Sequence, residues 1–365
     1  MKFTAPQSAL LDALTSAAAV ADAKWTMPIL AHVLLRVEGK RLTVAATDLT
    51  MSYVDAMSVT GGQDGSIALP AKIARDLIAN HKGDVTVKTD GAWADIKSGR
   101  TTMRLASMSS RDFPSLPEPP QTFAAVSAPE VVRILSACLP SVAHDETRLH
   151  LNAVQLLGQG KAMRAASTDG HRLTVTTADL SLPASAERGG LIGNDLSMLV
   201  PRAGAARLFA MAKGLATLEL ARSGPYLFAR SNDHLLAVKL VDAQYPPIEQ
   251  VIPKHTNRLS VDRAELLASV KRCALMSSES RGLSIAIGHD CLTLSSSDPD
   301  RGDVREELDA TCEAGPTIGV NPKYLIDALG AMATDRVSVD YGAALDPILV
   351  ADGAATFAVV MPMRI

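Results

Sequence analysis

An acidic and a basic side chain stand close together in the segment Thr168-Asp169-Gly170-His171-Arg172. An Asp beside a His can serve as an acid–base pair when a nucleophilic Ser or Cys completes the site. The chain contains no G-x-S-x-G motif or similar signature of an activated nucleophile, so a catalytic pair is the less favoured interpretation. The residues themselves favour a turn at the end of a strand, in which Asp169 caps backbone N–H groups and Gly170 adopts a positive φ.

Residues that could hold a metal ion or a phosphate do not group in the sequence. The chain lacks the G-x-x-x-x-G-K-[ST] phosphate loop and the G-x-G-x-x-G dinucleotide motif. Its cysteines form no C-x-x-C pair, so zinc is not expected, and we predict reduced thiols at Cys138, Cys273, Cys291 and Cys312. No cofactor and no metal ion is therefore expected.

The pair Thr168-Asp169 is one of three similar pairs in the chain. They follow one another at intervals of 121 and 129 residues, as Thr47-Asp48, Thr168-Asp169 and Ser297-Asp298. Three prolines, Pro70, Pro201 and Pro322, recur at intervals of 131 and 121 residues. Each opens a helix pattern and has a Lys or Arg close after it, as is typical of a helix start. Similar features at a similar period indicate an internal repeat.

Each repeat has the same order of predicted elements. An amphipathic helix pattern comes first, over 8–14, 129–135 and 263–270. Alternating strands follow it, among them one predicted over 149–154, and more strands follow the helix that begins after the proline. Two aromatic-proline linkers, Asp112–Pro117 and Ala243–Ile248, favour extended backbone. The sequence predicts an α+β fold of three similar domains, each with two helices packed on antiparallel sheets, over 1–120, 121–251 and 252–365.

Composition excludes several classes of protein. The 365 residues are 47% hydrophobic and 21% charged, and no apolar run is long enough to cross a membrane. Disordered, collagen-like and coiled-coil chains are therefore excluded. The 36 Lys and Arg against 39 Asp and Glu exclude a uniformly basic nucleic-acid binder. Cations recur on the predicted helices of all three repeats, however, so one face could be positive while the whole chain is negative.

Several short motifs, in order and over the whole chain, carry a resemblance to a known family. They are Met1–Thr4, Met27–Leu30, Thr168–Leu173, Lys239–Asp242 with Tyr245-Pro246, and Val359–Ile365. In these motifs the chain resembles the bacterial DNA polymerase III beta subunits, the sliding clamps. The resemblance implies the DNA clamp fold and a head-to-tail dimeric ring around duplex DNA. It also implies a processivity factor that tethers the replicative polymerase and has no catalytic site. A protein–protein scaffold that never encircles DNA is the alternative.

The resemblance also implies three groups of functional residues. A pocket for partner peptides would comprise Leu151, Thr168, Gly170, His171, Arg172, Leu173, Pro246, Val251, Val359, Val360, Met361, Pro362, Met363 and Arg364. The candidates that would face DNA are Lys24, Lys72, Arg75, Arg133, Arg202, Arg207 and Lys323. The dimer interface would bring together Met103 and Leu105 of one subunit with Leu275 and Met276 of the other.

The partners that the resemblance implies are double-stranded DNA of any sequence and a second copy of the chain. They also include the DNA polymerase III alpha subunit, the clamp loader delta subunit, and other polymerases and repair proteins that carry clamp-binding peptides. No membrane partner is expected, and the location would be the bacterial cytoplasm, in association with the nucleoid. The chain departs from the family pattern at Leu149-His150, where aromatic residues often precede Leu-Asn, and at Gln250, where an arginine is often found.

Overall fold

The computed structural model describes residues 1–21, 27–159, 162–179, 197–277 and 282–365. They form two compact units, which are described separately. The first unit contains Met1–Ala125 and Leu218–Lys239, and the second contains the other described residues from Val126 to Ile365.

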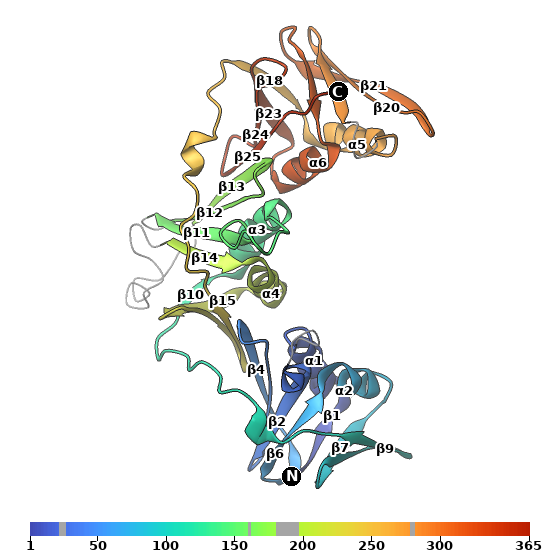
Figure 1. Ribbon diagram of the computed structural model, residues 1–365, viewed down its shortest axis with the longest axis vertical. Helices are drawn as coiled ribbons and strands as arrows, with labels where there is room; N and C mark the ends of the chain where they lie inside the picture. The colour runs from blue at the N-terminus through green and yellow to red at the C-terminus, as the bar shows by residue number, and fades with distance from the viewer. Residues whose placement is uncertain (22–26, 160–161, 180–196, 278–281) are drawn as a thin grey trace. The chain divides into compact units, whose positions relative to one another are not determined.

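Two helices of the first unit pack against each other (Figure 1). Helix α1 (Gln7–Ala18) buries Leu10, Ala13, Leu14 and Ala17, whose spacing places them on one face. Helix α2 (Ala71–Ala79) follows Pro70 and buries Ala71, Ala74 and Ile78. The helix predicted after the first landmark proline is thus confirmed.

Two antiparallel sheets complete the first unit. One has the order β5-β1-β7-β8-β9, with β1 (Lys2–Pro6), β5 (Thr60–Gln63), β7 (Asp84–Asp90), β8 (Trp93–Ser98) and β9 (Thr101–Ala106). The other has the order β10-β15-β16-β17-β4-β3-β2-β6, with β2 (His32–Glu38), β3 (Arg41–Thr47), β4 (Met51–Ser58), β6 (Gly65–Pro70), β10 (Ala124–Ser127), β15 (Thr217–Ser223), β16 (Tyr226–Ser231) and β17 (His234–Lys239). Short 3-10 turns η1 (Pro28–Ala31) and η2 (Ser110–Asp112) border them.

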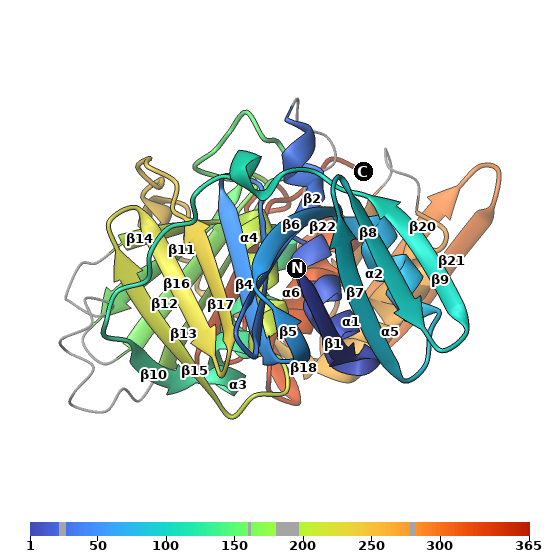
Figure 2. The same ribbon diagram turned by 90° about the horizontal axis from the view of Figure 1, so that it is seen from below.

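The second sheet of this unit combines strands from two repeats. Strand β17 of the central repeat pairs with β4 of the first repeat, from Leu235↔Val54 to Val238↔Met51, and lies beside it in Figure 2. Buried Leu236 and Ala237 of β17 thereby extend the core begun by the first repeat.

Four helices of the second unit form two packed pairs, α3 (Ala128–Cys138) with α4 (Arg202–Ala212) and α5 (Arg263–Ala274) with α6 (Pro322–Ala331). Helix α5 begins where the Asp262 carboxylate accepts a hydrogen bond from Glu265 N at 2.9 Å. Helix α6 begins where Asn321 Oδ1 accepts from Lys323 N at 2.9 Å, with Pro322 at its first position. Such caps satisfy backbone donors that have no partner inside the helix.

One antiparallel sheet runs through the second unit in the order β14-β11-β12-β13-β25-β24-β23-β18-β21-β20-β19-β22. Its strands are β11 (Ala153–Gln159), β12 (Ala162–Thr168), β13 (Arg172–Asp179), β14 (Ser197–Pro201), β18 (Asn257–Asp262), β19 (Leu283–Ile287), β20 (Cys291–Asp298), β21 (Gly302–Thr311), β22 (Thr317–Val320), β23 (Arg336–Tyr341), β24 (Ile348–Ala351) and β25 (Thr356–Val360). Turns η3 (Leu139–Ser141) and η5 (Ile248–Gln250) lie beside it. Pairing of β13 with β25 joins the central and C-terminal repeats.

The predicted α+β class, with two helices per repeat and antiparallel sheets, is confirmed. The strand predicted over 149–154 is wrong at its start. Leu151 N and Asn152 N both donate to Arg148 O at 2.9 Å, so the chain turns there and β11 begins at Ala153. Among the described residues, no helix is both long and apolar enough to cross a membrane.

Candidate functional site

The segment Thr168–Arg172 forms a tight turn between β12 and β13. The Thr168 hydroxyl donates to Arg172 O at 2.6 Å and accepts from Gly170 N at 3.1 Å. Asp169 Oδ1 accepts from His171 N at 2.9 Å and from Arg172 N at 3.1 Å. Gly170 has φ +94°, which a glycine adopts without strain. The Asp169 carboxylate thus binds backbone amides, as the turn prediction expects, and the segment is a structural turn.

The first repeat contains the same turn. Thr47 Oγ1 donates to Met51 O at 2.7 Å and accepts from Leu49 N at 3.0 Å. Asp48 Oδ1 accepts from Thr50 N at 2.8 Å and from Met51 N at 2.6 Å. The position equivalent to Gly170 is Leu49, which also has a positive φ, of +70°. The repeat seen in the sequence therefore extends to individual hydrogen bonds.

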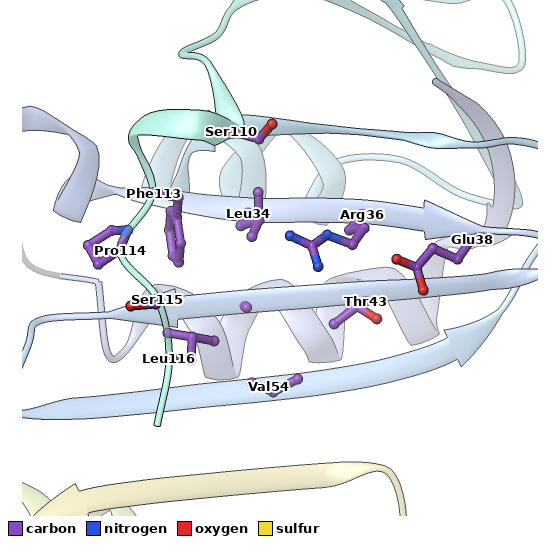
Figure 3. A pocket seen from close by; sticks show the side chains of 11 residues that line it. Leu34, Arg36, Glu38, Thr43, Val54, Ser110, Phe113, Pro114, Ser115 and Leu116 are labelled. Carbon is purple, nitrogen blue, oxygen red and sulfur yellow. The ribbon is translucent and has the colours of Figure 1, made fainter. Parts of the chain in front are cut away.

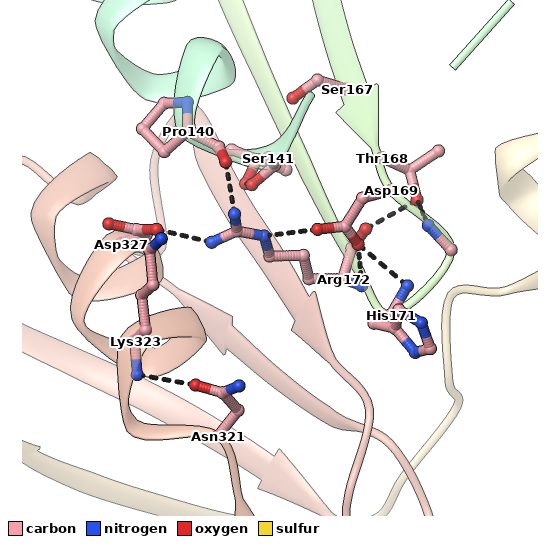
Figure 4. A network of polar contacts seen from close by, with 12 residues as sticks. Pro140, Ser141, Ser167, Thr168, Asp169, His171, Arg172, Asn321, Lys323 and Asp327 are labelled. Atoms are coloured by element: carbon pink, nitrogen blue, oxygen red, sulfur yellow. Dashed lines mark hydrogen bonds and ion pairs between the residues drawn. The ribbon is translucent and has the colours of Figure 1, made fainter. Parts of the chain in front are cut away.

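Arg172 is the centre of a buried polar network (Figure 4). Its side chain is 6% exposed, and Nε donates to Asp169 Oδ2 at 3.0 Å. Nη1 donates to Asp327 Oδ2 at 2.5 Å, and Nη2 donates to Pro140 O. The guanidinium lies over the Tyr324 ring, 4.4 Å from its centroid. All three guanidinium nitrogens and one face of this cation therefore have partners inside the protein.

The network links three elements of the second unit: the turn before β13, η3 and helix α6. The resemblance predicted Arg172 in a peptide pocket, whereas its partners Asp327 and Tyr324 were not predicted. Tyr324 was visible in the helix start Asn321–Tyr324, whereas nothing local marks Asp327, because 155 residues separate it from Arg172.

The C-terminal segment lies along the same region. In β25, Val359 and Val360 pair with Leu173 and Arg172 of β13. Met361 N then donates to His171 O at 3.0 Å. Beyond this point the tail changes neighbours and pairs with β22, through a bridge between Pro362 and Val320 and a bond from Met363 N to Gly319 O at 2.8 Å.

Two glycines make room for this tail. A Cβ on Gly319 would collide with the Met363 carbonyl oxygen, and a Cβ on Gly282 would collide with the Met363 sulfur. The close approach of backbone to backbone at Gly319 therefore requires a residue without a side chain. The position of the tail is a property of the fold of the C-terminal repeat.

The structure places all the pocket candidates within the second unit. Leu151, Leu173, Val359 and Val360 are buried. Met361 and Val251 are 42% and 52% exposed, and both are large apolar side chains. The remaining members lie in the turn, the tail and the segment before η5, as Thr168, Gly170, His171, Arg172, Pro246, Pro362, Met363 and Arg364. Large apolar side chains that are exposed to solvent are a feature of docking surfaces.

The candidates for facing DNA lie on the helices, apart from Lys24, which is outside the described residues. They are Lys72 and Arg75 on α2, Arg133 on α3, Arg202 and Arg207 on α4, and Lys323 on α6. Lys72 and Lys323 are exposed, and the others are half-buried.

Two of these arginines have partners within the fold. Arg133 binds Glu130 Oε2 at 2.9 Å, Thr176 Oγ1 at 2.9 Å and Thr177 O at 2.6 Å, so it ties α3 to β13. Arg75 pairs with Asp76 at 2.6 Å. Lys72 and Lys323 are therefore the better candidates for contact with a phosphate backbone.

The candidates for the dimer interface lie at exposed edges. Met103 and Leu105 are half-buried on β9, the last strand in the order of its sheet. Leu275, just after α5, is 69% exposed, and Met276 is half-buried beside it. An exposed leucine beside a helix end and apolar side chains on an edge strand are features that an interface would cover.

One carboxylate near these residues has a strongly shifted pKa. Arg272 of α5 binds Glu306 of β21 through two bonds of 2.5 Å. The Arg272 guanidinium, helped by the Ser269 hydroxyl, lowers the pKa of Glu306 to about 2. The pair fixes α5 to the long β20–β21 hairpin. No cluster of three or more His, Cys, Asp or Glu that could hold a metal ion occurs among the described residues.

Comparison with known proteins identifies the family. Models of the N-terminal, central and C-terminal domains of the DNA polymerase III beta subunit match residues 1–117, 125–247 and 249–364. The chain belongs to the DNA polymerase III beta subunit family. The resemblance seen in the sequence motifs is confirmed, and as a member of this family the chain is a sliding clamp, a processivity factor in DNA replication.

Relatives and solved structures match the chain over its full length. The beta sliding clamps of Pseudomonas aeruginosa and Escherichia coli are each 29% identical, with 100% of both chains covered. A crystal structure of the Pseudomonas aeruginosa sliding clamp matches with a TM-score of 0.89 at 27% identity, covering 100% of both chains. The Caulobacter crescentus pol III beta structure matches with a TM-score of 0.90 at 28% identity, also covering 100% of both chains. The three-domain clamp fold predicted from the resemblance is confirmed.

Proposed function

We propose that two copies of the chain close head to tail around duplex DNA and that each copy holds partner proteins through a peptide pocket beside its C-terminal tail. The observation that carries the proposal is the recurrence of paired helices with exposed cations, such as Lys72 on α2 and Lys323 on α6. Duplex DNA carries about one negative charge per 1.7 Å of its axis, irrespective of sequence. Scattered cations attract this charge without fixing the protein at one position, as sliding requires.

Edge strands support the dimer. In β21, Gly302–Asp309 pairs with β20, and only Ala310 and Thr311 pair with β18. The outer edge of 302–309 therefore has no strand partner among the described residues, and β9 is likewise an edge of its own sheet. The free edge of 302–309 belongs to the C-terminal repeat, which also carries exposed Leu275, and the free edge of β9 belongs to the N-terminal repeat. Such edges suit the joining of one subunit's N-terminal repeat to the other's C-terminal repeat.

The peptide pocket accounts for partner binding. Met361 and Val251 offer exposed apolar surface, and flexible methionine adapts to several ligands. The partners would be the DNA polymerase III alpha subunit, the clamp loader delta subunit and other replication or repair proteins. A polymerase held there meets its primer end at high effective concentration, which gives processivity without a catalytic group in the clamp.

The proposal includes the bounds of the domains and the location of the chain. The repeats would correspond to domains over 1–120, 121–251 and 252–365, and the chain would act in the cytoplasm at the nucleoid.

The dimer and the function can be tested together with Leu275→Glu. Light scattering should give a mass of about twice 38.4 kDa for the unaltered protein and one copy for the variant. Primer extension on a long template should give long products with the unaltered protein and short ones with the variant. A monomeric unaltered protein, or long products from a monomeric variant, would contradict the proposal.

A further inference from the structure

A groove of about 500 Å³ lies on the first unit, on the side of its sheet away from α1 and α2 (Figure 3). Its floor is an apolar row across three strands, in which Leu34 pairs with Ala45 and Ala45 pairs with Val54. Phe113 and Leu116 of the linker after η2 border it. Arg36 and Glu38 of β2 lie at the other end of the groove.

The linker that borders the groove, the strap Phe113–Leu116, is anchored at its start. Ser66 Oγ donates to Ser110 Oγ at 2.7 Å, and Ala68 and Met108 exchange backbone hydrogen bonds of 2.9 and 3.1 Å. Phe113 packs with Met108 against the buried cluster of Ile29, Leu30 and Ala68. The groove is therefore formed before any ligand arrives, which lowers the entropic cost of binding.

The central repeat has a matching strap, Tyr245–Ile248, over the matching strands. Ala166 pairs with Val175 there as Ala45 pairs with Val54 in the first unit. Tyr245 and Ile248 are 8% and 3% exposed and pack into one cluster with Leu173 and Val359. Two members of that cluster belong to the proposed peptide pocket. The groove of the first unit thus lies at the place in the first repeat that corresponds to this part of the peptide pocket in the central repeat.

One ion pair beside the strap of the second unit has no counterpart beside the strap of the first unit. In the second unit, Arg164 of β12 binds Glu249, which follows the strap, at 2.8 Å, and the Arg164 side chain is only 17% exposed. The positions that correspond by register and by strap alignment are Thr43 and Pro117 in the first unit. A threonine and a proline carry no charge and cannot form an ion pair. Thr43 instead lines the groove.

A cation is nevertheless present in the groove. Arg36 lies opposite Thr43 in the β2–β3 pairing and is exposed. Within the described part of the chain, no hydrogen bond or ion pair joins the Arg36 side chain to another residue. Glu249 supplies the carboxylate for Arg164 in the second unit, whereas the first unit has the guanidinium and an apolar floor but no carboxylate bound to it.

We propose that this groove binds an extended segment of a partner protein in which an acidic side chain adjoins a bulky apolar one. The apolar side chain lies between Leu34, Val54 and Leu116, and the carboxylate binds Arg36 as Glu249 binds Arg164. Guanidinium and carboxylate form paired hydrogen bonds that fix orientation as well as charge. This site goes beyond the proposed function, because it needs neither DNA nor the pocket beside the C-terminal tail.

The test uses two peptides, acetyl-Asp-Leu-Phe-amide and acetyl-Lys-Leu-Phe-amide, added to the full-length protein with labelled methyl groups. The Asp peptide should shift the Leu34, Val54 and Leu116 methyl signals to saturation. Arg36→Glu should weaken that binding by about fivefold and strengthen binding of the Lys peptide, as expected for one partly exposed ion pair. The control Arg100→Glu reverses an exposed cation outside the groove lining and should change neither affinity.

A second variant closes the groove with the ion pair of the central repeat. Thr43→Arg together with Pro117→Glu should abolish the methyl shifts and leave the fold unchanged. Equal shifts with both peptides, unchanged binding in the closed variant, or no shift at these methyls would overturn the proposal. Shifts that follow protein concentration without peptide would also overturn it, because a second copy would then cover the groove. The Met361 and Met363 methyls report on the other pocket separately.

Discussion

Replacement of Arg172 by alanine should destabilise the second unit more than any substitution of an exposed arginine. The change leaves Asp169 and Asp327 without their cation, and their side chains are only 15% and 24% exposed. Breaking a buried ion pair on one side costs about 3–5 kcal/mol. Because the two carboxylates retain some contact with water, we take the lower end, about 3 kcal/mol.

This loss should be visible in thermal unfolding. For a unit of this size, about 1 kcal/mol corresponds to about 2–4 °C, so the melting temperature should fall by about 6–12 °C. Arg172→Lys should give an intermediate loss, since one ammonium cannot reach Asp169, Asp327 and Pro140 together. The matched control is Arg148→Ala, which breaks an ion pair with both side chains at least 40% exposed and should cost less than about 1 kcal/mol.

Differential scanning calorimetry on the purified full-length variants measures these shifts. A melting temperature for Arg172→Ala no lower than that of Arg148→Ala would contradict this prediction. It would mean that the buried network contributes no more than a surface pair.

Three further predictions concern the tail, the hairpin and the helices. Gly319→Ala should displace the tail, because the new Cβ collides with the Met363 carbonyl oxygen. Carboxypeptidase should then digest the C-terminus faster. The control Gly330→Ala, whose new Cβ meets nothing within 4 Å, should leave the digestion rate unchanged. Glu306→Gln should lower stability by about 1 kcal/mol at neutral pH. The pKa of Glu306 in the folded protein is lowered to about 2. The contribution of its carboxylate to stability is therefore complete above the pKa of the unfolded chain and disappears as the pH falls through about 2. The melting curves of the variant and the unaltered protein should converge at that pH. Charge reversal of Lys72 and Lys323 together should weaken DNA binding and flatten its salt dependence, and an unchanged slope in a salt titration would exclude both from contact with DNA.

The repeat and its turns could be predicted because they depend on local chemistry. Thr168-Asp169 and Thr47-Asp48 form their turns with bonds that reach no further than four residues along the chain. Helix α2 begins directly after Pro70 and helix α6 begins at Pro322 for the same reason. The segment 149–152 was misassigned because its apolar residues resemble a strand, whereas backbone bonds to Arg148 bend it into a turn.

Contacts between repeats could not be predicted from local patterns. The pairing of β17 with β4 and of β13 with β25 joins strands separated by more than a hundred residues, so no local pattern specifies which strands meet. As a result, the compact units of the chain do not coincide with its repeats. The structural roles of Arg172 and Arg133 could not be predicted for the same reason, because their partners Asp327 and Thr176 are distant in sequence.

In the proposed ring, closure around the duplex, and not affinity for it, holds the protein on DNA. The most direct measurement loads the protein with its clamp loader onto a closed circular duplex, isolates the complex, and then cuts the circle once. We predict that the protein stays on the intact circle through a wash at high salt and leaves as soon as the circle becomes linear. Equal retention on both forms, or loss from both in proportion to salt, would contradict encirclement and favour a scaffold that binds other proteins without enclosing DNA.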